Sequence, residues 1–520
     1  MIADLRRGAT LVARLSDVRA RWVWRRREQA FRRFLNRVRW PAADARGGDV
    51  LVVVEAWLAT PLPWFMLTVA AGLAARGRRV RIVRDDVSCG PDTATRGYEQ
   101  HSIRAVQASL PSAVQRILLS DIQPAGGVAI CASSIGRLAE LNTIQKYRGE
   151  HLPSESDAYR SAVEEALLRA AARVEPLLQQ TNPRYVVLGG GIYGSSGIFI
   201  DVGRRMGCRV ATLDSGSGVM LAATDGIAAY LDDIPAAFRL LSNDDEWVVA
   251  EAEAELERRM QRKDAFQYQL ATSTGQVDPV GVLLPLNHSF DSASRGRHRV
   301  FKNQTEWMLE TVAWVLECTS ETIAVRRHPS ERLDSHTSND DYAALLTSRF
   351  GRNGRLKYIS ADVPVNTYDL IRQASVVVPY VSTVGIEAAA MGKPVVTEGA
   401  SCYVDLGFVW GAGTRDEYFG AIRRALGGHL QLSEPQRQAA WRCYYLTQCC
   451  NFLHTRFTPQ PNDFDTWVKE SPEAILSSPE IVDLLNAIDS ATPLSLVRHA
   501  RIRVQHQAMA HTGDAAKVVT

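Results

Sequence analysis

The segment 376–398 (VVVPYVSTVGIEAAAMGKPVVTE) has an order of residue types that leaves few choices of fold. Its opening valines predict a buried β-strand, because β-branched residues suit a pleated and buried surface. Ser382 and Thr383 stand where a following helix would be N-capped, and Gly392 stands where that helix would end. A second apolar run then restarts the chain. Strand, turn, helix and strand in this order predict an α/β fold with a parallel sheet.

The turn of this segment has the chemistry of an anion-binding site. The hydroxyls of Ser382 and Thr383, together with free backbone N–H groups, would lie at a helix N-terminus beyond the carboxyl end of a strand. An α/β sheet binds phosphate at such a place. Glu387 would follow about one helical turn later, within reach of a sugar hydroxyl beside that phosphate.

The pattern Ser382-Thr383-x-Gly385-x-Glu387-Ala, followed by Gly-Lys-Pro at 392–394, resembles the nucleotide-sugar half-site of GT-B glycosyltransferases. In particular it resembles bacterial capsule-polysaccharide biosynthesis and export proteins, a group that includes Kdo-transferase-like enzymes. Many relatives carry two serines before the Thr, whereas here Val381 replaces the first, which removes one phosphate contact.

Two upstream segments extend the resemblance, which covers roughly residues 280 to 420. The stretch 325–331 (VRRHPSE) looks like the family's His-Pro segment, and 281–287 (GVLLPLN), followed by Asp291, looks like its opening strand and loop. The resemblance implies that His328 and Pro329 lie against the donor phosphate. Arg326 or Arg327 would supply positive charge beside them. Asn287 and Asp291, in the loop after the first strand, are candidates to orient donor or acceptor.

The resemblance further implies the reaction. A GT-B enzyme displaces a nucleotide at an anomeric carbon without a bound metal or cofactor, so the nucleotide-sugar would be a co-substrate. An inverting transfer needs one general base for the acceptor hydroxyl. Asp214, in Leu213-Asp214-Ser215-Gly216, is the leading candidate because a carboxylate there would lie at the carboxyl end of a strand.

Length and patterning predict the domain organisation. A chain of 520 residues is too long for one core, so two or three domains are expected. Apolar runs alternate with helical stretches, which predicts two doubly wound parallel sheets facing a cleft. The predicted parts are a basic amphipathic helical N-terminus (1–45), an acceptor-side α/β domain (46–270), a nucleotide-sugar-binding α/β domain (271–430), C-terminal helices (431–508) and a disordered tail (509–520).

A glycine-rich motif in the first half supports a different interpretation. Gly189, Gly191 and Gly194 match GxGxxG between a predicted strand and a predicted helix, and Asp214 lies 20 residues after Gly194. This is the spacing of a dinucleotide-binding fingerprint, in which Asp214 would bind a ribose. In a GT-B fold the same glycines would let an acceptor or donor approach the backbone closely. Both interpretations stay open.

The charge of the chain is concentrated at its N-terminus. Residues 1–40 hold twelve Arg and three acidic residues, which gives this segment a net charge of 12 − 3 = +9. Since the whole chain has a net charge of +3, the remaining residues have a net charge of 3 − 9 = −6. Apolar residues recur among these arginines near helical spacing, with three Trp. Such a helix can lie on an anionic membrane surface or pack on the protein with a solvated basic face. No recognised nucleic-acid fold follows, so nucleic acid is not an expected partner.

The rest of the composition favours a cytoplasmic protein. No window of 18 apolar residues and no signal-peptide pattern occurs, and the eight Cys are scattered without zinc spacing. We therefore expect a glycosyltransferase of surface-polysaccharide assembly at the inner face of the cytoplasmic membrane. A CMP-activated acidic sugar such as Kdo or sialic acid is the favoured donor and a UDP-sugar is the alternative; the acceptor would be a glycan or lipid-linked glycan. The alternatives are an NAD(P)-dependent oxidoreductase and a non-catalytic export or assembly protein.

Overall fold

The computed structural model describes residues 2–38, 40, 49–54, 62–88, 104–111, 114–126, 132–216, 219–242, 247–264, 277–334, 336–454 and 469–512. The chain forms two compact units, each assembled from three separate stretches. Unit 1 comprises Met1–Ala139, Ser161–Gly226 and Leu453–Thr492; unit 2 comprises Glu140–Arg160, Ile227–Phe452 and Pro493–Thr520. The consecutive domain boundaries inferred from the sequence stay predictions.

Unit 1 is built on a seven-stranded sheet in the order β13-β6-β5-β4-β1-β2-β3. All neighbours from β3 to β5 are parallel, whereas β6 pairs antiparallel with both β5 and β13. The strands are β1 (Asp49–Val54), β2 (Arg79–Arg84), β3 (Gln115–Leu118), β4 (Tyr185–Gly189), β5 (Arg209–Gly216), β6 (Val219–Ala223) and β13 (Leu453–His454). The helices are α1 (Ile2–Arg37), α2 (Leu62–Ala75), α4 (Ala132–Tyr147), α5 (Ser156–Thr181), α6 (Ser196–Arg205), α16 (Pro472–Leu476) and α17 (Pro479–Ser490), of which α4 and α5 continue into unit 2.

The strand order of unit 1 reverses at its first strand. The chain runs from β1 to β2 and β3 on one side, and from β4 to β5 on the other side of β1. Since parallel crossovers are right-handed, α2 and α6 cover opposite faces of the sheet. The junction between β1 and β4 is therefore the topological switch point, where ligands bind in open α/β sheets.

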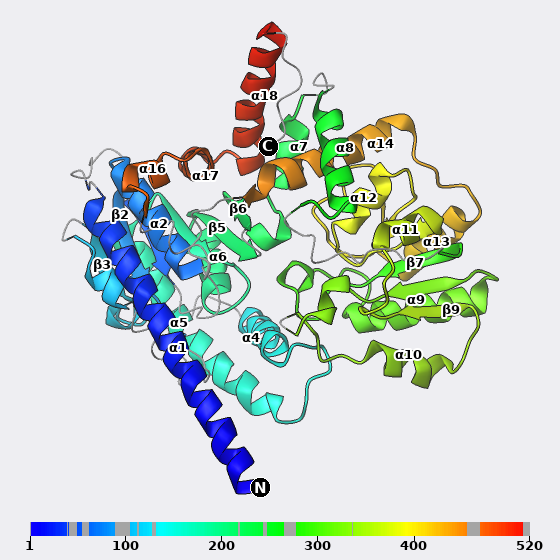
Figure 1. Ribbon diagram of the computed structural model, residues 1–520, viewed down its shortest axis with the longest axis horizontal. Coiled ribbons are helices and arrows are strands. Elements are labelled where there is room, and N and C mark those ends of the chain that lie inside the picture. The colour runs from blue at the N-terminus through cyan, green and yellow to red at the C-terminus, as the bar shows by residue number, and fades with distance from the viewer. Residues whose placement is uncertain are drawn as a thin grey trace. The chain divides into compact units, whose positions relative to one another are not determined.

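Unit 2 contains a four-stranded parallel sheet in the order β10-β7-β8-β9, of which β7 and β9 are labelled in Figure 1, and a separate two-stranded pair β11-β12. Its strands are β7 (Val280–Pro285), β8 (Ile323–Arg326), β9 (Leu356–Ile359), β10 (Ala374–Val377), β11 (Val396–Thr397) and β12 (Trp410–Gly411). Its helices are α7 (Ile234–Leu240), α8 (Trp247–Met260), α9 (Gln304–Cys318), α10 (Tyr342–Phe350), α11 (Thr367–Gln373), α12 (Val384–Ala390), α13 (Arg415–Leu426), α14 (Glu434–Tyr444), a π-helix (Tyr445–Asn451) and α18 (Leu494–Thr512).

The fold class predicted from the sequence, α/β with two doubly wound parallel sheets, is confirmed by these topologies. Strand β7 is buried at all six positions, as expected for the centre of a parallel sheet. The predicted disordered tail (509–520) overlaps the end of α18, which runs to Thr512; residues 513–520 lie outside the described part of the chain.

Helix α1 has two consecutive parts: a C-terminal half that packs on unit 1 and an N-terminal half that projects from it. We call them the docked half and the projecting half. Trp24 and Phe31 are buried and pack on Trp64 of α2, with ring centroids 5.7 and 5.4 Å apart. Toward its N-terminus, Val18 and Trp22 are 62% and 56% exposed, and the helix leaves the rest of unit 1 (Figure 1). The docked half is held by aromatic burial, whereas the projecting half shows apolar side chains to solvent.

Candidate functional site

The predicted site residues of unit 2 gather at one edge of its sheet. Asn287 and Asp291 follow β7, His328 follows β8, and Ser382 and Thr383 follow β10. Because β10, β7 and β8 are parallel neighbours, their carboxyl ends and the loops after them meet at the same edge. Strand β7 is also the switch point of this sheet, since the chain proceeds to β8 on one side and later places β10 on the other.

Two histidines from different loops are joined through one serine. His288, after β7, and His328, after β8, have ring centroids 4.2 Å apart. The hydroxyl of the fully buried Ser330 lies 2.8 Å from His328 Nδ1 and 2.8 Å from His288 Nε2. His288 Nδ1 donates to the backbone carbonyl of His336 at 2.9 Å. Burial and the neighbouring His288 lower the pKa of His328 well below its usual value, so this imidazole is neutral at pH 7.

Asn287 is fixed by an adjacent buried glutamine and keeps one atom without a partner. Its backbone N–H donates to Gln304 Oε1, and Gln304 Nε2 donates back to its carbonyl, both at 3.0 Å. The amide Nδ2 faces Asp291 at 3.5 Å, and Asp291 itself caps the short turn that follows by accepting from Ala293 N–H. The side-chain oxygen of Asn287 is buried and has no hydrogen-bond partner among the described residues. Buried orphan acceptors are uncommon, so this oxygen is available to a ligand.

Arg326 and Glu387 are held inside unit 2 by protein groups. The guanidinium of Arg326 donates to the carbonyls of Ser360 and, at 3.1 Å, Val365; burial and Arg332 lower the pKa of Arg326 to about 10. Glu387, 1% exposed, accepts from the Tyr368 hydroxyl at 2.9 Å and lies 3.8 Å from the guanidinium of Arg259. Burial is the largest influence on Glu387 and raises the pKa of its carboxyl group.

Ser382 and Thr383 lie at the start of α12 with their side chains half-exposed. Ser382 Oγ accepts from Val384 N–H at 3.3 Å, and no cap hydrogen bond engages the Thr383 hydroxyl. Gly385 serves a packing need, because a Cβ there would lie 2.2 Å from the hydroxyl oxygen of Tyr403. That hydroxyl in turn donates to the carbonyl of Ser382 at 2.6 Å and fixes the turn.

In unit 1 the glycine-rich loop lies at the carboxyl end of β4, in the β4-α6-β5 context that the sequence predicts. A Cβ on Gly189 would lie 2.5 Å from Leu62 Cδ2, so the protein's own α2 fills the space beside this glycine. Gly191 and Gly194 have φ of 111° and 58°, which residues with a Cβ rarely adopt. Asp214 lies within β5, opposite Leu221 of β6, because the strand continues past the position where the sequence suggests that it ends.

Sequence reasoning missed three members of the site: His288, Ser330 and Gln304. Two of them had a signal in the sequence. His288 directly follows the proposed loop residue Asn287, and Ser330 directly follows the His-Pro pair. Gln304 stands at the first position of α9, and only the folded structure brings it to Asn287.

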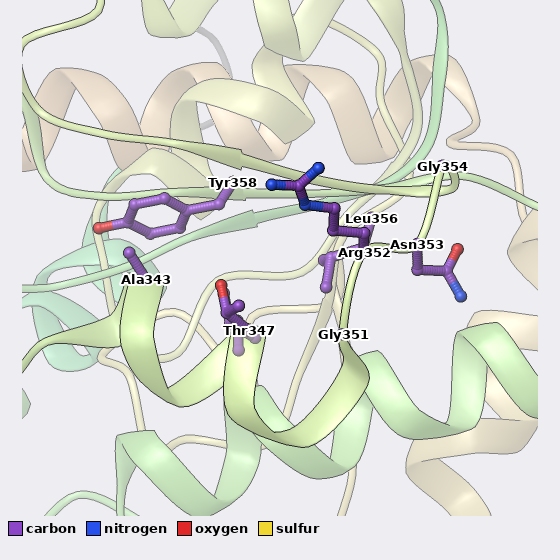
Figure 2. A pocket seen from close by; sticks show the side chains of 9 residues that line it. Ala343, Thr347, Gly351, Arg352, Asn353, Gly354, Leu356 and Tyr358 are labelled. Carbon is purple, nitrogen blue, oxygen red and sulfur yellow. The ribbon is translucent and has the colours of Figure 1, made fainter.

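Within the described ranges, no group of three or more His, Cys, Asp or Glu side chains is placed to hold a metal ion. Nor does any helix in these ranges combine the length and apolar character needed to cross a bilayer. A pocket of ≈ 390 Å³ lies between α10 and β9 (Figure 2). Its lining includes Thr347, Arg352 and Tyr358 and none of the predicted site residues; it lies toward the amino end of β9, opposite the edge where the histidines meet.

Comparison with protein families gives a match over the part of the chain that holds this site. Residues 251–421 match the family described as capsule polysaccharide biosynthesis protein. The resemblance to this family is confirmed for that segment. It contains the loops after β7, β8 and β10, whereas α1 and the glycine-rich loop lie outside it. A search of curated proteins gives no match to the chain.

Solved structures also align with the chain at low identity. The beta Kdo 2,7 transferase KpsC of Thermosulfurimonas dismutans is 17% identical over 52% of this chain and 79% of that chain, with a TM-score of 0.31. The beta Kdo 2,4 transferase KpsC of the same organism is 14% identical over 50% and 79%, with a TM-score of 0.35. The UDP-GlcNAc 2-epimerase of Methanocaldococcus jannaschii is 12% identical over 75% and 97%, with a TM-score of 0.25.

Proposed function

We propose that this protein is a glycosyltransferase of bacterial surface (capsular) polysaccharide biosynthesis that uses a nucleotide-sugar donor. The observation that carries the proposal is the family match over 251–421, which encloses the loops after β7, β8 and β10 in unit 2. At the edge where these loops meet, the buried Asn287 Oδ1 has no hydrogen-bond partner among the described residues, and His328 is bound to Ser330 through Nδ1, on the other side of its ring from Nε2. These groups, with the Ser382 and Thr383 turn, suit a phosphorylated sugar at a switch point.

The charges around His328 support an anionic donor. Four neighbouring groups lower the pKa of His328 by electrostatic repulsion: His288, Arg259, Arg326 and His336. Each of them is a cation or becomes one when protonated. A positive environment with unfilled hydrogen-bonding atoms binds phosphate. We favour a CMP-activated acidic sugar such as Kdo or sialic acid, because a His-Pro segment precedes a Ser-Thr turn; a UDP-sugar is the alternative.

The transfer itself would be a metal-independent inverting displacement onto a glycan or lipid-linked acceptor. Asp214 is our proposed general base, and its replacement by Asn should abolish transfer without weakening nucleotide binding. If Asp214→Asn and His328→Ala variants both sustain normal polysaccharide production in cells, the protein is a non-catalytic assembly component.

The test of the donor site is a thermal-shift comparison of CMP, UDP, GDP and NAD(H) at matched concentrations. A ligand that binds only the folded state raises the unfolding midpoint by mass action. We expect a shift with CMP or UDP that disappears in Ser382→Ala/Thr383→Val and persists in Thr347→Val, which removes an exposed hydroxyl at the other edge of the sheet. A shift with NAD(H) alone would refute the transferase proposal and select an oxidoreductase that uses the Gly189–Asp214 fingerprint.

We also propose that the projecting half of α1 binds the anionic inner face of the cytoplasmic membrane. Trp22 is exposed and carries the Arg26 guanidinium over its ring at 4.8 Å, beside exposed Arg19, Arg21 and Arg25. Arginines flanking an exposed Trp suit anionic lipid headgroups. Flotation with phosphatidylglycerol vesicles should fail for Trp22→Ser/Arg26→Glu and for neutral phosphatidylcholine vesicles. Equal flotation of this variant would contradict membrane binding, and Trp24 must stay intact because it packs on Trp64.

A further inference from the structure

Three contacts, two that join His328 to His288 through Ser330 and one from His288 to the His336 carbonyl, place a strict condition on the hydrogens of the two imidazoles. The carbonyl of His336 can only accept, so His288 Nδ1 must carry a hydrogen. Ser330 lies 2.8 Å from a ring nitrogen on each side, yet its hydroxyl has a single hydrogen to donate. It can therefore donate to one imidazole only and must accept from the other.

Two arrangements satisfy this condition. When His288 is neutral, its Nε2 is a lone pair that accepts from the Ser330 hydroxyl, and Ser330 Oγ accepts from His328 Nδ1–H. His328 Nε2 is then an acceptor. When His288 is an imidazolium, its Nε2–H donates to Ser330 Oγ, the Ser330 hydroxyl donates to His328 Nδ1, and His328 carries its hydrogen on Nε2. The Ser330 backbone N–H also donates to His328 Nδ1 at 3.3 Å; this contact fits the second arrangement and opposes the Nδ1–H of the first.

We propose that Ser330 couples the two imidazoles, so that a proton stored on His288 converts His328 Nε2 from an acceptor into a donor for the phosphate of the bound nucleotide. The ligand part of this inference rests on the proposed function; the coupling itself rests on the three contacts. His288 and Ser330 are thus positioning residues that act through His328. They lie on separate loops, which the neighbouring strands β7 and β8 hold together.

A proton can enter through His328, and atoms and charge balance at each step of its transfer to His288. His328 Nε2 accepts one proton from solvent, Nδ1–H passes its hydrogen to Ser330 Oγ, and the hydroxyl passes its own hydrogen to His288 Nε2. The net result is one added positive charge on His288 and a neutral His328 with its hydrogen moved from Nδ1 to Nε2. No bond between heavy atoms forms or breaks.

The surroundings explain why a ligand would operate this relay. A positive charge at His328 is disfavoured by His336 on the following loop, Arg326 on β8 and Arg259 on α8. A positive charge at His336 is likewise disfavoured by His288 and Arg148. Asp291, on the loop after β7, faces the Asn287 amide. Without an anion, these positive neighbours keep His328 neutral. A phosphate that arrives beside His328 offsets this repulsion and favours uptake of the proton.

Imidazole nitrogen NMR on the full-length, histidine-labelled protein tests the relay without any ligand. Resonances are assigned with His288→Gln and His328→Gln. During the titration of His288 we expect the hydrogen of His328 to move from Nδ1 to Nε2 at the same midpoint. The movement should be lost in Ser330→Ala and kept in Ser289→Ala, which removes a neighbouring buried hydroxyl bonded to Tyr342 instead. If His328 keeps one tautomer while wild-type His288 titrates, the relay is refuted, whether or not Ser330→Ala folds.

Adding CMP or UDP separates the relay from the function. A nucleotide that prefers the protonated pair should raise the midpoint, and a rise of one pH unit corresponds to about tenfold tighter binding by that form. If the tautomer switch occurs but neither nucleotide moves it, the proposed donor site fails and the coupling stands. If a nucleotide binds while His328 keeps its tautomer, the coupling fails and the donor site stands.

Discussion

The carboxylate of Glu150 offers the sharpest test of how unit 2 is held together. It lies at the N-terminus of α9, where one oxygen accepts from Gln304 N–H at 3.1 Å and the other from Thr305 N–H at 2.9 Å. The first oxygen also pairs with the Arg295 guanidinium at 2.9 Å, and both side chains are under 5% exposed. A negative charge is therefore buried between a helix N-terminus and a cation, which both favour it.

Glu150→Gln keeps the shape and removes the charge. The new amide nitrogen must face either the guanidinium or the Thr305 N–H, which are donors, so at least one contact becomes a donor–donor clash. Breaking a buried pair by neutralising one partner costs about 3–5 kcal/mol, because the other charge stays buried without compensation. Loss of the charge at the helix terminus contributes up to about 2 kcal/mol within that range. We expect the free energy of unfolding of unit 2 to fall by about 3–5 kcal/mol.

Urea unfolding monitored by tryptophan fluorescence measures this change, since Trp307 is buried in the first turn of α9. The control is Glu434→Gln, which breaks an exposed pair with Arg437 and should cost less than about 1 kcal/mol. Adding Arg295→Met to Glu150→Gln should restore at least half of the loss, because no unpaired charge then stays buried. A Glu150→Gln loss equal to that of the control would refute the burial argument.

Three further changes have defined outcomes. Gly385→Ala should lower the free energy of unfolding by about 1–3 kcal/mol, because the new Cβ would lie 2.2 Å from the Tyr403 hydroxyl; equal midpoints in urea would contradict the clash. Asp489→Asn should cost about 1.5–3 kcal/mol in unit 1, because the Asp489 carboxylate accepts from the Tyr185 hydroxyl at 2.6 Å; Tyr185→Phe in the same background should then cost little more. Burial raises the pKa of Glu387, so the folded state holds its proton more tightly than the unfolded state. The contribution of Glu387 is therefore most favourable below about pH 4.3 and is lost as pH rises above it; Glu387→Gln should flatten the fall of stability above about pH 4.3, and an unchanged pH profile would contradict this.

The local elements of the candidate site were predictable because short-range patterns determine them. The valine run before Ser382 predicts a strand at 376–378, and β10 is Ala374–Val377; the glycine after the helical run predicts the end of a helix at 391, and α12 ends at Ala390. The parallel order also follows from alternating strands and helices. His328 could be assigned to a ligand-binding loop for the same reason, since strand ends in parallel sheets share an edge.

The assignments of side-chain roles could not be predicted because they depend on distant partners. Glu387 is buried by Tyr368 and Arg259, which lie 19 and more than 100 residues away in the chain. The strand before Asp214 extends further than its apolar run suggests, because β6 pairs with it antiparallel and satisfies its backbone. The Ser330 hydroxyl can bridge two imidazoles only because the neighbouring strands β7 and β8 bring His288 and His328 to either side of it.

The interleaving of the two units has a consequence for synthesis on the ribosome. Unit 1 takes its last stretch, Leu453–Thr492, from beyond nearly all of unit 2, and that stretch supplies β13 and the helix α17 that packs on α2. At about 5–20 residues per second, the ribosome needs roughly 15–50 s to travel from residue 226 to residue 492. During this interval the α2 side of Gly72, against which Leu485 finally packs, has no cover from α17. During synthesis the first unit therefore leaves this part of α2 uncovered until α17 (Pro479–Ser490) has emerged.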